Sequence, residues 1–240
     1  MKIIIAVPAY NEEKILVKNI ARLQEFCHGH FFGEYLIVVV DNNSQDATSS
    51  LGRQLAEQQE NVEYLFVADQ GKGLAIRAAW ESFSADVYCF MDADLAIDLS
   101  ALPVLIDAVS QESYDLAIGS RFHRQSIVDR SLIRKFFSQG YRLVLKLLLG
   151  IKIADAPCGF KAISQKVKDE VLPRVQDTKW FFDSELVIIA EKLGYKIKEI
   201  PVHFHNSRTV DDPSRVAPIK LTLDYLKKAL VLKARLKVLK

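Results

Sequence analysis

Short apolar runs alternate with amphipathic stretches over the first half of the chain. The apolar runs are rich in β-branched residues and have the length of buried strands. They cover Lys2–Val7, Tyr35–Val40, Val62–Val67 and Val87–Met91. The stretches between them have helical spacing and cover Glu12–Cys27, Ala47–Gln58 and Gly71–Phe83. Such regular alternation predicts βαβ units, and therefore an α/β fold with a mostly parallel sheet flanked by helices.

The pattern is less regular after Gly119. It predicts, in order, a helix over Ser131–Leu149, an irregular loop over Ile153–Phe160, a helix over Phe182–Leu193, a strand over Lys196–Val202, a polar loop as far as Ala217 and a terminal helix. No linker interrupts the chain, and 240 residues, half of them hydrophobic, can bury one large core. We therefore expect a single domain over residues 1–217, followed by a basic amphipathic helix over residues 218–240.

The net charge of +2 hides an uneven distribution. Residues 121–152 carry eight Lys or Arg and one acid, and residues 219–240 carry seven and one, which leaves the rest of the chain acidic. Nucleic acid is one candidate partner for such basic segments, but both are rich in aliphatic residues, which favours a membrane surface. For the terminal helix, a solvated cap on the domain is the alternative. No apolar stretch approaches the roughly 20 residues that a membrane-spanning helix needs.

The cysteines and the N-terminus bear on the compartment. Cys27, Cys89 and Cys158 are widely spaced and odd in number, so they form neither a disulfide framework nor a metal-spaced cluster. The N-terminal apolar run soon meets Pro8 and two acids and is too short for a signal peptide. These features predict a cytoplasmic protein, peripheral on the cytoplasmic face of a membrane.

Two carboxylates directly follow the fourth predicted strand. Asp92 and Asp94 are one residue apart and leave the carboxyl end of Val87–Met91, where open α/β sheets bind ligands. Adjacent anions repel each other unless a positive charge lies between them. A divalent cation that carries a diphosphate satisfies this requirement. The alternative is an N-cap with a spare acid, since a helix is expected from about Leu99.

The other early strands also end in polar clusters. The first is followed by Pro8-Ala9-Tyr10-Asn11-Glu12-Glu13, the second by Asp41-Asn42-Asn43-Ser44-Gln45-Asp46, and the third by Gln70-Gly71-Lys72-Gly73 and then Arg77. Each cluster alone is compatible with a helix cap or a turn. Together they place acids, amides and cations on one edge of one sheet, which suits a nucleoside diphosphate.

These motifs occur in the order of a known family. P-A-Y-N-E-E, V-V-D-N-N-S-Q-D-A-T, G-K-G-x-A-x-R-x-A, D-A-D-L, G-S-R and D-x-x-C-G-F-K resemble those of the inverting glycosyltransferase family 2, over roughly residues 3–217. The subgroup they resemble is the polyprenyl-phosphate glycosyltransferases, which include the dolichyl-phosphate glucose and mannose synthases. The resemblance implies the Rossmann-like GT-A fold, a nucleotide-sugar donor of the UDP-glucose or GDP-mannose type, a dolichyl or undecaprenyl phosphate acceptor, and Mg²⁺ or Mn²⁺.

The resemblance also implies roles for single residues. On the donor side, Pro8, Tyr10 and Glu12 line the nucleoside pocket, Asp41 contacts the base, and Lys72 and Arg77 lie near the base and phosphates. Asp92 reaches the ribose or the metal, and Asp94 ligates the metal. On the acceptor side, the implied residues are Ser120, Arg121, Arg134 and Arg215, with the loop of Asp155, Cys158 and Gly159. The segment Trp180–Glu185 resembles the W-x-F-D-x-E motif, in which Asp183 and Glu185 orient sugar hydroxyls or form an acid pair at a helix start.

Two positions depart from the family. Mannose synthases of this type often carry Gln two residues after the second Asp, where this chain has Ala96, and this favours the glucose-synthase-like branch. The loop Asn206–Pro213 is charged where relatives have a short glycine-containing turn.

Two other functions are compatible with these residues. A family 2 enzyme that acts on a soluble saccharide or protein acceptor would need a base to deprotonate a hydroxyl, and Asp183 is the candidate. A nucleotide-sugar-binding protein without turnover is the other alternative, against which the intact set of Lys72, Asp92, Asp94 and Arg121 argues.

Overall fold

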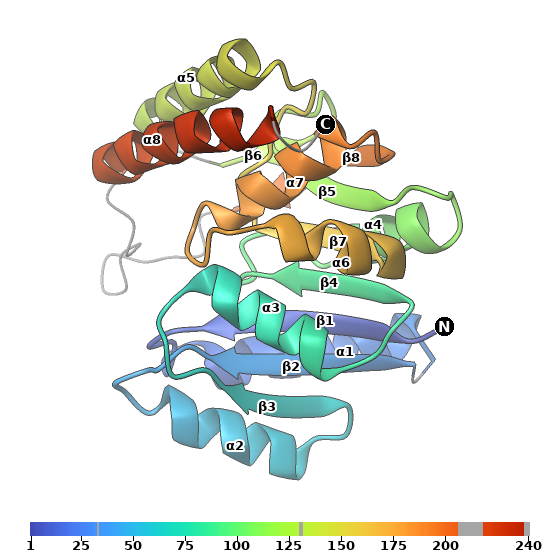
Figure 1. Ribbon diagram of the computed structural model, residues 1–240. Helices are drawn as coiled ribbons and strands as arrows, with labels where there is room; N and C mark the ends of the chain where they lie inside the picture. Colours follow the sequence, from blue (N-terminus) through green and yellow to red (C-terminus); the bar gives the residue numbers. More distant parts are fainter. Residues whose placement is uncertain (33, 130–131, 206–217, 238–240) are drawn as a thin grey trace.

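The computed structural model describes residues 1–32, 34–129, 132–205 and 218–237, and within these it leaves the side chains of residues 132–137 and 218–223 undescribed. Its centre is a seven-stranded sheet with strand order β3-β2-β1-β4-β7-β5-β8 (Figure 1). The strands are β1 (Ile3–Ala9), β2 (Tyr35–Asp41), β3 (Val62–Phe66), β4 (Val87–Met91), β5 (Leu116–Ser120), β7 (Phe160–Ser164) and β8 (Ile197–Pro201). The predicted α/β fold with a mostly parallel sheet is confirmed.

Helices cover both faces of the sheet. One face packs against α1 (Leu16–His30), α2 (Thr48–Gln58) and α4 (Ala101–Ser110). The other packs against α3 (Lys72–Ser82), α6 (Gln165–Glu170) and α7 (Phe182–Lys192), with the short 3-10 helix η1 (Leu172–Arg174) after α6. The strands are buried on both faces, and this explains why their sequences read as continuous apolar runs rather than alternating ones.

The strand β7 was not predicted, and it is the exception to the parallel arrangement of the main sheet. It lies antiparallel between β4 and β5, with Cys89 and Ala117 both opposite Ala162. Its sequence, Phe-Lys-Ala-Ile-Ser, contains a lysine where an apolar run would signal a buried strand. The expected irregular loop over Ile153–Phe160 ends where this strand begins.

Two long helices pack together beyond the edge of the sheet. They are α5 (Leu132–Leu149) and α8 (Pro218–Leu236), which lie side by side at the top of Figure 1, and the rings of Tyr141 and Tyr225 meet between them at 5.3 Å. On α8, Ala229 and Leu232 are fully buried in the same core as α3 and α7. The terminal helix expected from the sequence is therefore packed into the domain along one side. None of the described helices is both long and apolar enough to cross a bilayer.

A small second sheet lies beyond the carboxyl end of β5. It pairs β6 (Ile127–Val128) with β9 (His203–Phe204) in parallel. His203 lies on β9 and His205 directly follows it. The charged loop Asn206–Pro213, which departs from the family, and the family-implied Arg215 lie outside the described residues.

Candidate active site

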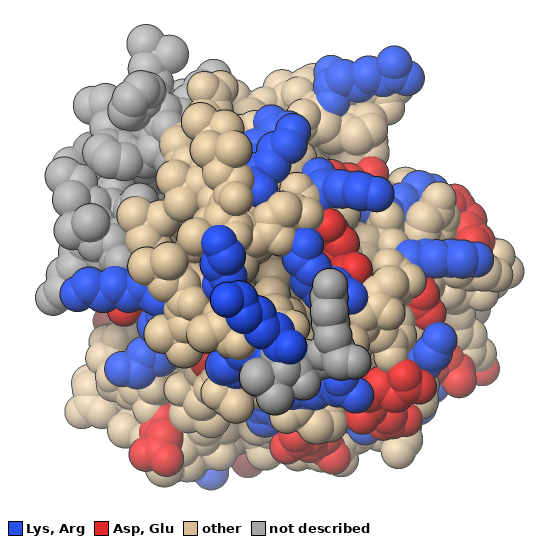
Figure 2. Space-filling model, turned by 45° about the horizontal axis from the view of Figure 1, so that its top comes forward, with Lys and Arg blue, Asp and Glu red and all other residues tan. Residues whose placement is uncertain are grey.

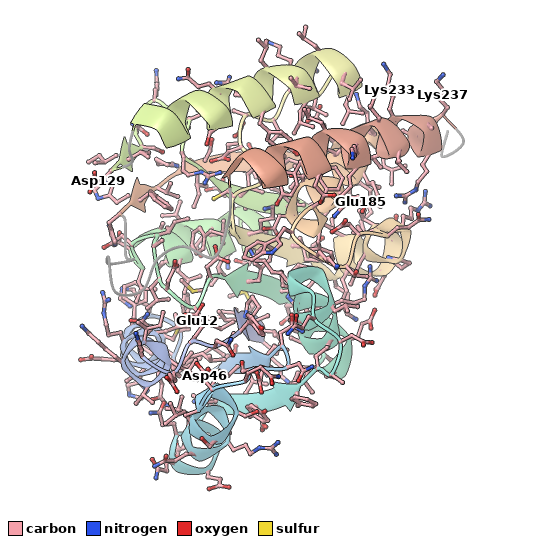
Figure 3. The ribbon with its side chains drawn as sticks, turned by 90° about the vertical axis from the view of Figure 1, so that its left-hand side faces the viewer. Glu12, Asp46, Asp129, Glu185, Lys233 and Lys237 are labelled. Carbon is pink, nitrogen blue, oxygen red and sulfur yellow. The ribbon has the colours of Figure 1, made fainter. Side chains whose placement is uncertain are left out.

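The loops that follow β1 and β2 are bonded to each other at the carboxyl edge of the sheet. Ala9 at the end of β1 lies opposite Asp41 at the end of β2, so both loops begin at the same level. The Asn11 amide donates to Ser44 Oγ (2.9 Å), and the Glu12 amide donates to Thr48 Oγ1 (2.7 Å). Glu12 and Asp46 come from these two neighbouring loops (Figure 3). The helix α1 begins at Leu16 rather than at the predicted Glu12.

The predicted nucleoside residues border these loops. Pro8 and Tyr10 are partly buried at the end of β1, and Glu12 is 8% exposed. Asp41 is fully buried, and its carboxylate accepts hydrogen bonds from the Ser44 amide (3.0 Å), the Tyr64 hydroxyl (3.0 Å) and the Ser49 hydroxyl. Burial raises the pKa of Asp41, but these hydrogen bonds outweigh it and lower the pKa overall. In this structure Asp41 holds the loop after β2, and a contact with the base stays a prediction.

Lys72 is the charged centre of the site. It is the first residue of α3, its side chain is 7% exposed, and its Nζ lies 2.7 Å from Asp92 Oδ1 and 2.8 Å from Asp183 Oδ2. Burial lowers the pKa of Lys72, but Asp183 and then Asp92 raise it by more, so the ammonium is held charged. The predicted residues Lys72, Asp92 and Asp183 therefore lie together, although they come from three different elements.

The glycines on both sides of Lys72 allow α3 to approach the segment before α7. A Cβ on Gly71 would lie 2.2 Å from the carbonyl oxygen of Thr178, and one on Gly73 would lie 2.7 Å from Phe182 Cβ. The Thr178 carbonyl also accepts a hydrogen bond from the Leu74 amide (3.1 Å). The G-K-G motif is thus required by close packing of this helix start, which brings Lys72 within reach of Asp183.

The predicted metal carboxylates follow β4 in a tight turn. Asp94 is partly buried, its Oδ1 accepts a hydrogen bond from the Ala96 amide (3.1 Å), and Leu95 has a positive φ of 46°. Asp92 packs on Gly159, where a Cβ would lie 2.2 Å from Asp92 Oδ2. This close approach gives Gly159 of the acceptor-side loop a direct role in placing the Asp92 carboxylate.

Arg121 and Asp155 form a second charged pair beside Asp92. Arg121 donates from Nε and a terminal nitrogen to the two oxygens of Asp155, at 2.7 and 2.6 Å, and its amide also donates to Asp155 at 2.8 Å. Burial lowers the pKa of Arg121, but Asp155 and, more weakly, Asp92 raise it by more, so the pKa lies above its usual value. The guanidinium has five N–H donors, and Asp155 occupies two of them, so others can serve a ligand. Ser120, the residue before it, is 1% exposed at the end of β5.

Lys161 is a buried cation that the sequence analysis did not select. It is fully buried on β7, where its Nζ donates to the Cys158 carbonyl and lies 5.2 Å from the centre of the Phe90 ring. The Lys72 Nζ lies 5.2 Å from the same ring. Burial lowers the pKa of Lys161 more than the nearby Asp183 raises it, and Lys72 adds to the decrease. The signal for it was the last letter of the D-x-x-C-G-F-K motif.

Three predicted cations stand apart from this cluster or outside the description. Arg77 donates to the carbonyls of Leu172 (3.1 Å) and Val175 (2.8 Å), so in this structure it fastens α3 to η1. Its proposed contact with base or phosphates stays a prediction. The side chain of Arg134, on the first turn of α5, and the whole of Arg215 lie outside the described residues.

We expect the Arg121–Asp155 pair to make stability depend on pH in acid. Burial raises the pKa of Asp155, but Arg121 outweighs it, so the pKa lies below its usual value near 3.8. Stability from this group is fully present above about pH 4 and is lost as the pH falls through the folded-state pKa. Asp155→Asn should therefore lower the free energy of unfolding at neutral pH and flatten its decline below about pH 4, as measured by urea titrations at several pH values. Parallel pH curves for the two proteins would contradict the assignment.

Comparison with known proteins identifies the family of this chain. Residues 4–172 match the model of glycosyl transferase family 2. The chain is 30% identical to the dolichyl-phosphate beta-glucosyltransferase of Saccharomyces cerevisiae, over 94% of this chain and 71% of that protein. It is 28% identical to the glycosyltransferase AglD of Haloferax volcanii over 84% of this chain, and the match spans only 33% of AglD.

A solved structure supports the fold. Glucosyl-3-phosphoglycerate synthase from Mycobacterium tuberculosis, in complex with Mn²⁺, UDP-glucose and phosphoglyceric acid, superposes with a TM-score of 0.69 at 15% identity, covering 98% of this chain and 79% of that one. The α/β architecture is that of the GT-A glycosyltransferases. With the family model matching well over half of its length, the chain belongs to glycosyl transferase family 2 and is a glycosyltransferase.

Proposed function

We propose that this enzyme transfers a hexose, with inversion, from a nucleoside diphosphate sugar to a polyprenyl monophosphate. The observation that carries the proposal is the placement of two separately held cations, Lys72 and Arg121, near the carboxylate of Asp92. One cation is available to a leaving diphosphate and the other to an incoming phosphate. The names of the relatives, dolichyl-phosphate beta-glucosyltransferases, support the acceptor class.

The donor side of the site fits a nucleotide sugar. Pro8, Tyr10 and Glu12 border the loop pair after β1 and β2, at the same sheet edge as Lys72 and Asp92. We assign the nucleoside to the loops and the diphosphate to Lys72. Ala96 stands where mannose synthases often carry Gln, and the relatives are glucosyltransferases, so UDP-glucose is the donor that we favour over GDP-mannose.

Asp92 and Asp94 fit a divalent cation shared with the donor. The described residues contain no group of three or more His, Cys, Asp or Glu side chains arranged to hold a metal by themselves. Mg²⁺ and Mn²⁺ sites of this kind commonly use one or two carboxylates plus substrate phosphates, so two partly exposed carboxylates are the appropriate protein contribution. When bound, the cation would neutralise charge that develops on the leaving diphosphate. The Mn²⁺ in the complex of the mycobacterial synthase supports this assignment.

The acceptor needs no general base. A phosphate monoester has its second pKa near about 6 and is largely dianionic at neutral pH, so its oxygen can attack the anomeric carbon directly. The new C–O bond forms as the bond to the nucleoside diphosphate breaks, and attack from the opposite face inverts the anomeric carbon. Arg121 and Ser120, with Arg134 and Arg215, offset the repulsion between the two phosphates. The Asp183 carboxylate that a hydroxyl acceptor would need as a base is buried against Lys72.

The surface formed by α5 and α8 suits the lipid-bearing acceptor. Its exposed aliphatic side chains are Leu143, Leu147, Leu230 and Val231, which are 56%, 76%, 56% and 62% exposed. Exposed cations lie among them on the same helices: Lys146, Lys227 and Lys233. Figure 2, in which the top of the molecule comes forward, shows Lys and Arg spread over uncharged surface. We call these residues the α5–α8 surface and assign it to the cytoplasmic face of a membrane. The three described cysteines are free, as a reducing compartment requires.

The substrate assignment is tested by a donor and acceptor panel. UDP-glucose, GDP-mannose and UDP-N-acetylglucosamine are each offered with a short-chain prenyl phosphate, the corresponding prenyl alcohol and a soluble glycan. We expect a glycosylated prenyl phosphate, most rapidly from UDP-glucose, because only the phosphate supplies a nucleophile without a base. Faster transfer to the alcohol or the glycan would replace the proposal with a soluble-acceptor enzyme. Donor binding without any product would indicate a protein without turnover.

We expect Asp94→Ala to abolish nearly all turnover while leaving the fold intact, because a partly exposed carboxylate at a turn contributes little to the core. The measurement is the steady-state rate with Mg²⁺ or Mn²⁺, together with Mn²⁺ binding in the presence of UDP. Asp107→Ala, at an exposed position on α4, is the matched control and should keep the wild-type rate and the wild-type Mn²⁺ binding. Full activity in EDTA, or an active Asp94→Ala enzyme, would refute the metal assignment.

Membrane binding is tested by sedimentation with anionic liposomes at low and high salt. Each Lys or Arg near an anionic surface contributes up to about 1 kcal/mol, weakened by salt. Lys146→Glu and Lys233→Glu should therefore weaken binding at low salt, and Leu147→Ser should weaken it at both salt concentrations. Arg22→Glu, exposed on α1, is the matched control. Binding that ignores salt and all three substitutions would refute the assignment of this surface.

A further inference from the structure

Two side chains of α8 contact the segment that precedes α7, and a third contacts the residues on both sides of it. The Tyr225 hydroxyl donates to the carbonyl of Trp180 (2.6 Å), and the Lys228 Nζ lies 2.8 Å from Asp177 Oδ2. Arg235 pairs with Glu185 through one terminal nitrogen and donates to the Arg174 carbonyl through the other (2.7 Å). We call residues 177–181 the pre-α7 segment. The contacts span most of the described length of α8, so the helix holds the segment at several points.

Asp177 and Glu185 each connect α8 to the backbone of the pre-α7 segment. Asp177 offers Oδ2 to Lys228, while its Oδ1 accepts from the amides of Lys179 (2.8 Å) and Phe182 (3.1 Å). Glu185 offers Oε1 to Arg235, while its Oε2 accepts from the Asp177 amide (2.6 Å). Each carboxylate thus binds an α8 cation with one oxygen and the backbone of the pre-α7 segment with the other. The backbone conformation of this segment is tied to the position of α8.

The other side of the pre-α7 segment faces the charged centre. Its Thr178 carbonyl accepts from the first turn of α3, and its Trp180 ring centre lies 5.5 Å from Lys72 Nζ. Asp183, two residues beyond the segment, lies 2.8 Å from the same Nζ. We propose that α8 is a positioning element of the catalytic site: Tyr225 and Lys228 hold the pre-α7 segment directly, and Arg235 holds it through Glu185, so that Asp183 meets Lys72.

Burial makes this coupling strong. Glu185 is a carboxylate with a side chain only 2% exposed, and removing Arg235 leaves this interior charge with the Asp177 amide but without a cation. The segment then has to rearrange so that the carboxylate reaches water, and the same rearrangement moves the start of α7, where Asp183 lies. Displacements of about 1 Å in a catalytic group can cost about 100-fold in rate.

The opposite face of α8 is the one assigned to the membrane. Figure 3 shows Glu185 beneath the helix and Lys233 and Lys237 projecting away from the domain. Tyr225 and Leu232 are buried on the inner face, and Leu230 and Val231 are exposed. One rigid helix therefore joins the proposed lipid-facing surface to the pre-α7 segment. A lipid surface that favours the docked helix would also favour the ordered site.

The test compares Arg235→Met, Arg235→Lys and Tyr225→Phe in the full chain. Lys198→Met is the matched control: Lys198 lies on the edge strand β8, and the substitution removes its ion pair with Glu112. Turnover is measured with UDP-glucose and a short-chain prenyl phosphate, an assay that rests on the proposed function. Acrylamide quenching of tryptophan fluorescence is the second readout and needs no substrate. The chain has two tryptophans, of which Trp80 is fully buried and Trp180 is 44% exposed, so quenching reports on the pre-α7 segment.

We expect Arg235→Met to lower kcat by about 10- to 100-fold and to increase quenching, with cooperative unfolding and circular dichroism preserved. Arg235→Lys should recover part of both losses, because it keeps the charge opposite Glu185. Tyr225→Phe, which removes one hydroxyl, should shift both readouts in the same direction and remains informative if Arg235→Met does not fold. Wild-type quenching and kcat in Tyr225→Phe and in a folded Arg235 variant would overturn the proposal. If the wild-type enzyme does not use prenyl phosphate, the proposed function fails, and the quenching result still decides this one.

Discussion

The structure depends on one buried ammonium that lies between two carboxylates. Lys72 joins Asp92, at the end of β4, to Asp183, at the start of α7, through contacts of 2.7 and 2.8 Å. The Asp92 side chain is 44% exposed, whereas those of Lys72 and Asp183 are 7% and 4% exposed. An ammonium or a carboxylate taken out of water without a partner costs several kcal/mol, so Lys72 and Asp183 are stable in the interior only together. The Lys72–Asp183 pair therefore fixes the position of α3, in the first half of the chain, against α7, in the second half.

Further buried charges extend this arrangement across the site. Arg121 with Asp155, and Lys161 near Phe90, add two cations and one carboxylate next to Asp92. Lys72, Arg121 and Lys161 thus lie near the carboxylates of Asp92, Asp155 and Asp183. A nucleoside diphosphate and a phosphate bring several negative charges, which a divalent cation and the remaining N–H donors of Arg121 would offset.

Much of the fold and part of the site could be predicted from the sequence. Continuous apolar runs identified β1, β2 and β4, and the rule that ligands bind at the carboxyl ends of parallel strands placed Asp92 correctly at the edge of the sheet. Lys72 was selected from the polar cluster after the third strand and from the G-K-G motif, and its flanking glycines prove to be needed for close helix packing. The local sequence pattern was sufficient to predict a feature wherever its signal was contained in a short stretch of neighbouring residues.

The rest could not be predicted because it depends on contacts between distant residues. The antiparallel strand β7 was missed since Lys161 interrupts its apolar pattern. The pairing of Arg235 with Glu185 joins positions 50 residues apart, which no periodicity reveals. The hydrogen bonds that the Asp41 carboxylate accepts from Ser44, Ser49 and Tyr64 were not predicted, and its contact with the base stays a prediction.

The most direct test of the central interaction is a double-mutant cycle on the free energy of unfolding with Lys72→Met and Asp183→Asn. Lys72→Met leaves the buried Asp183 carboxylate without its cation and should cost about 3–5 kcal/mol. Asp183→Asn leaves Lys72 paired with Asp92 and should cost less. The double mutant should lose less than the sum of the two, with a coupling of about 1–3 kcal/mol. Additive losses would show that the ammonium and the carboxylate do not depend on each other, and would contradict this account of how the site is held together.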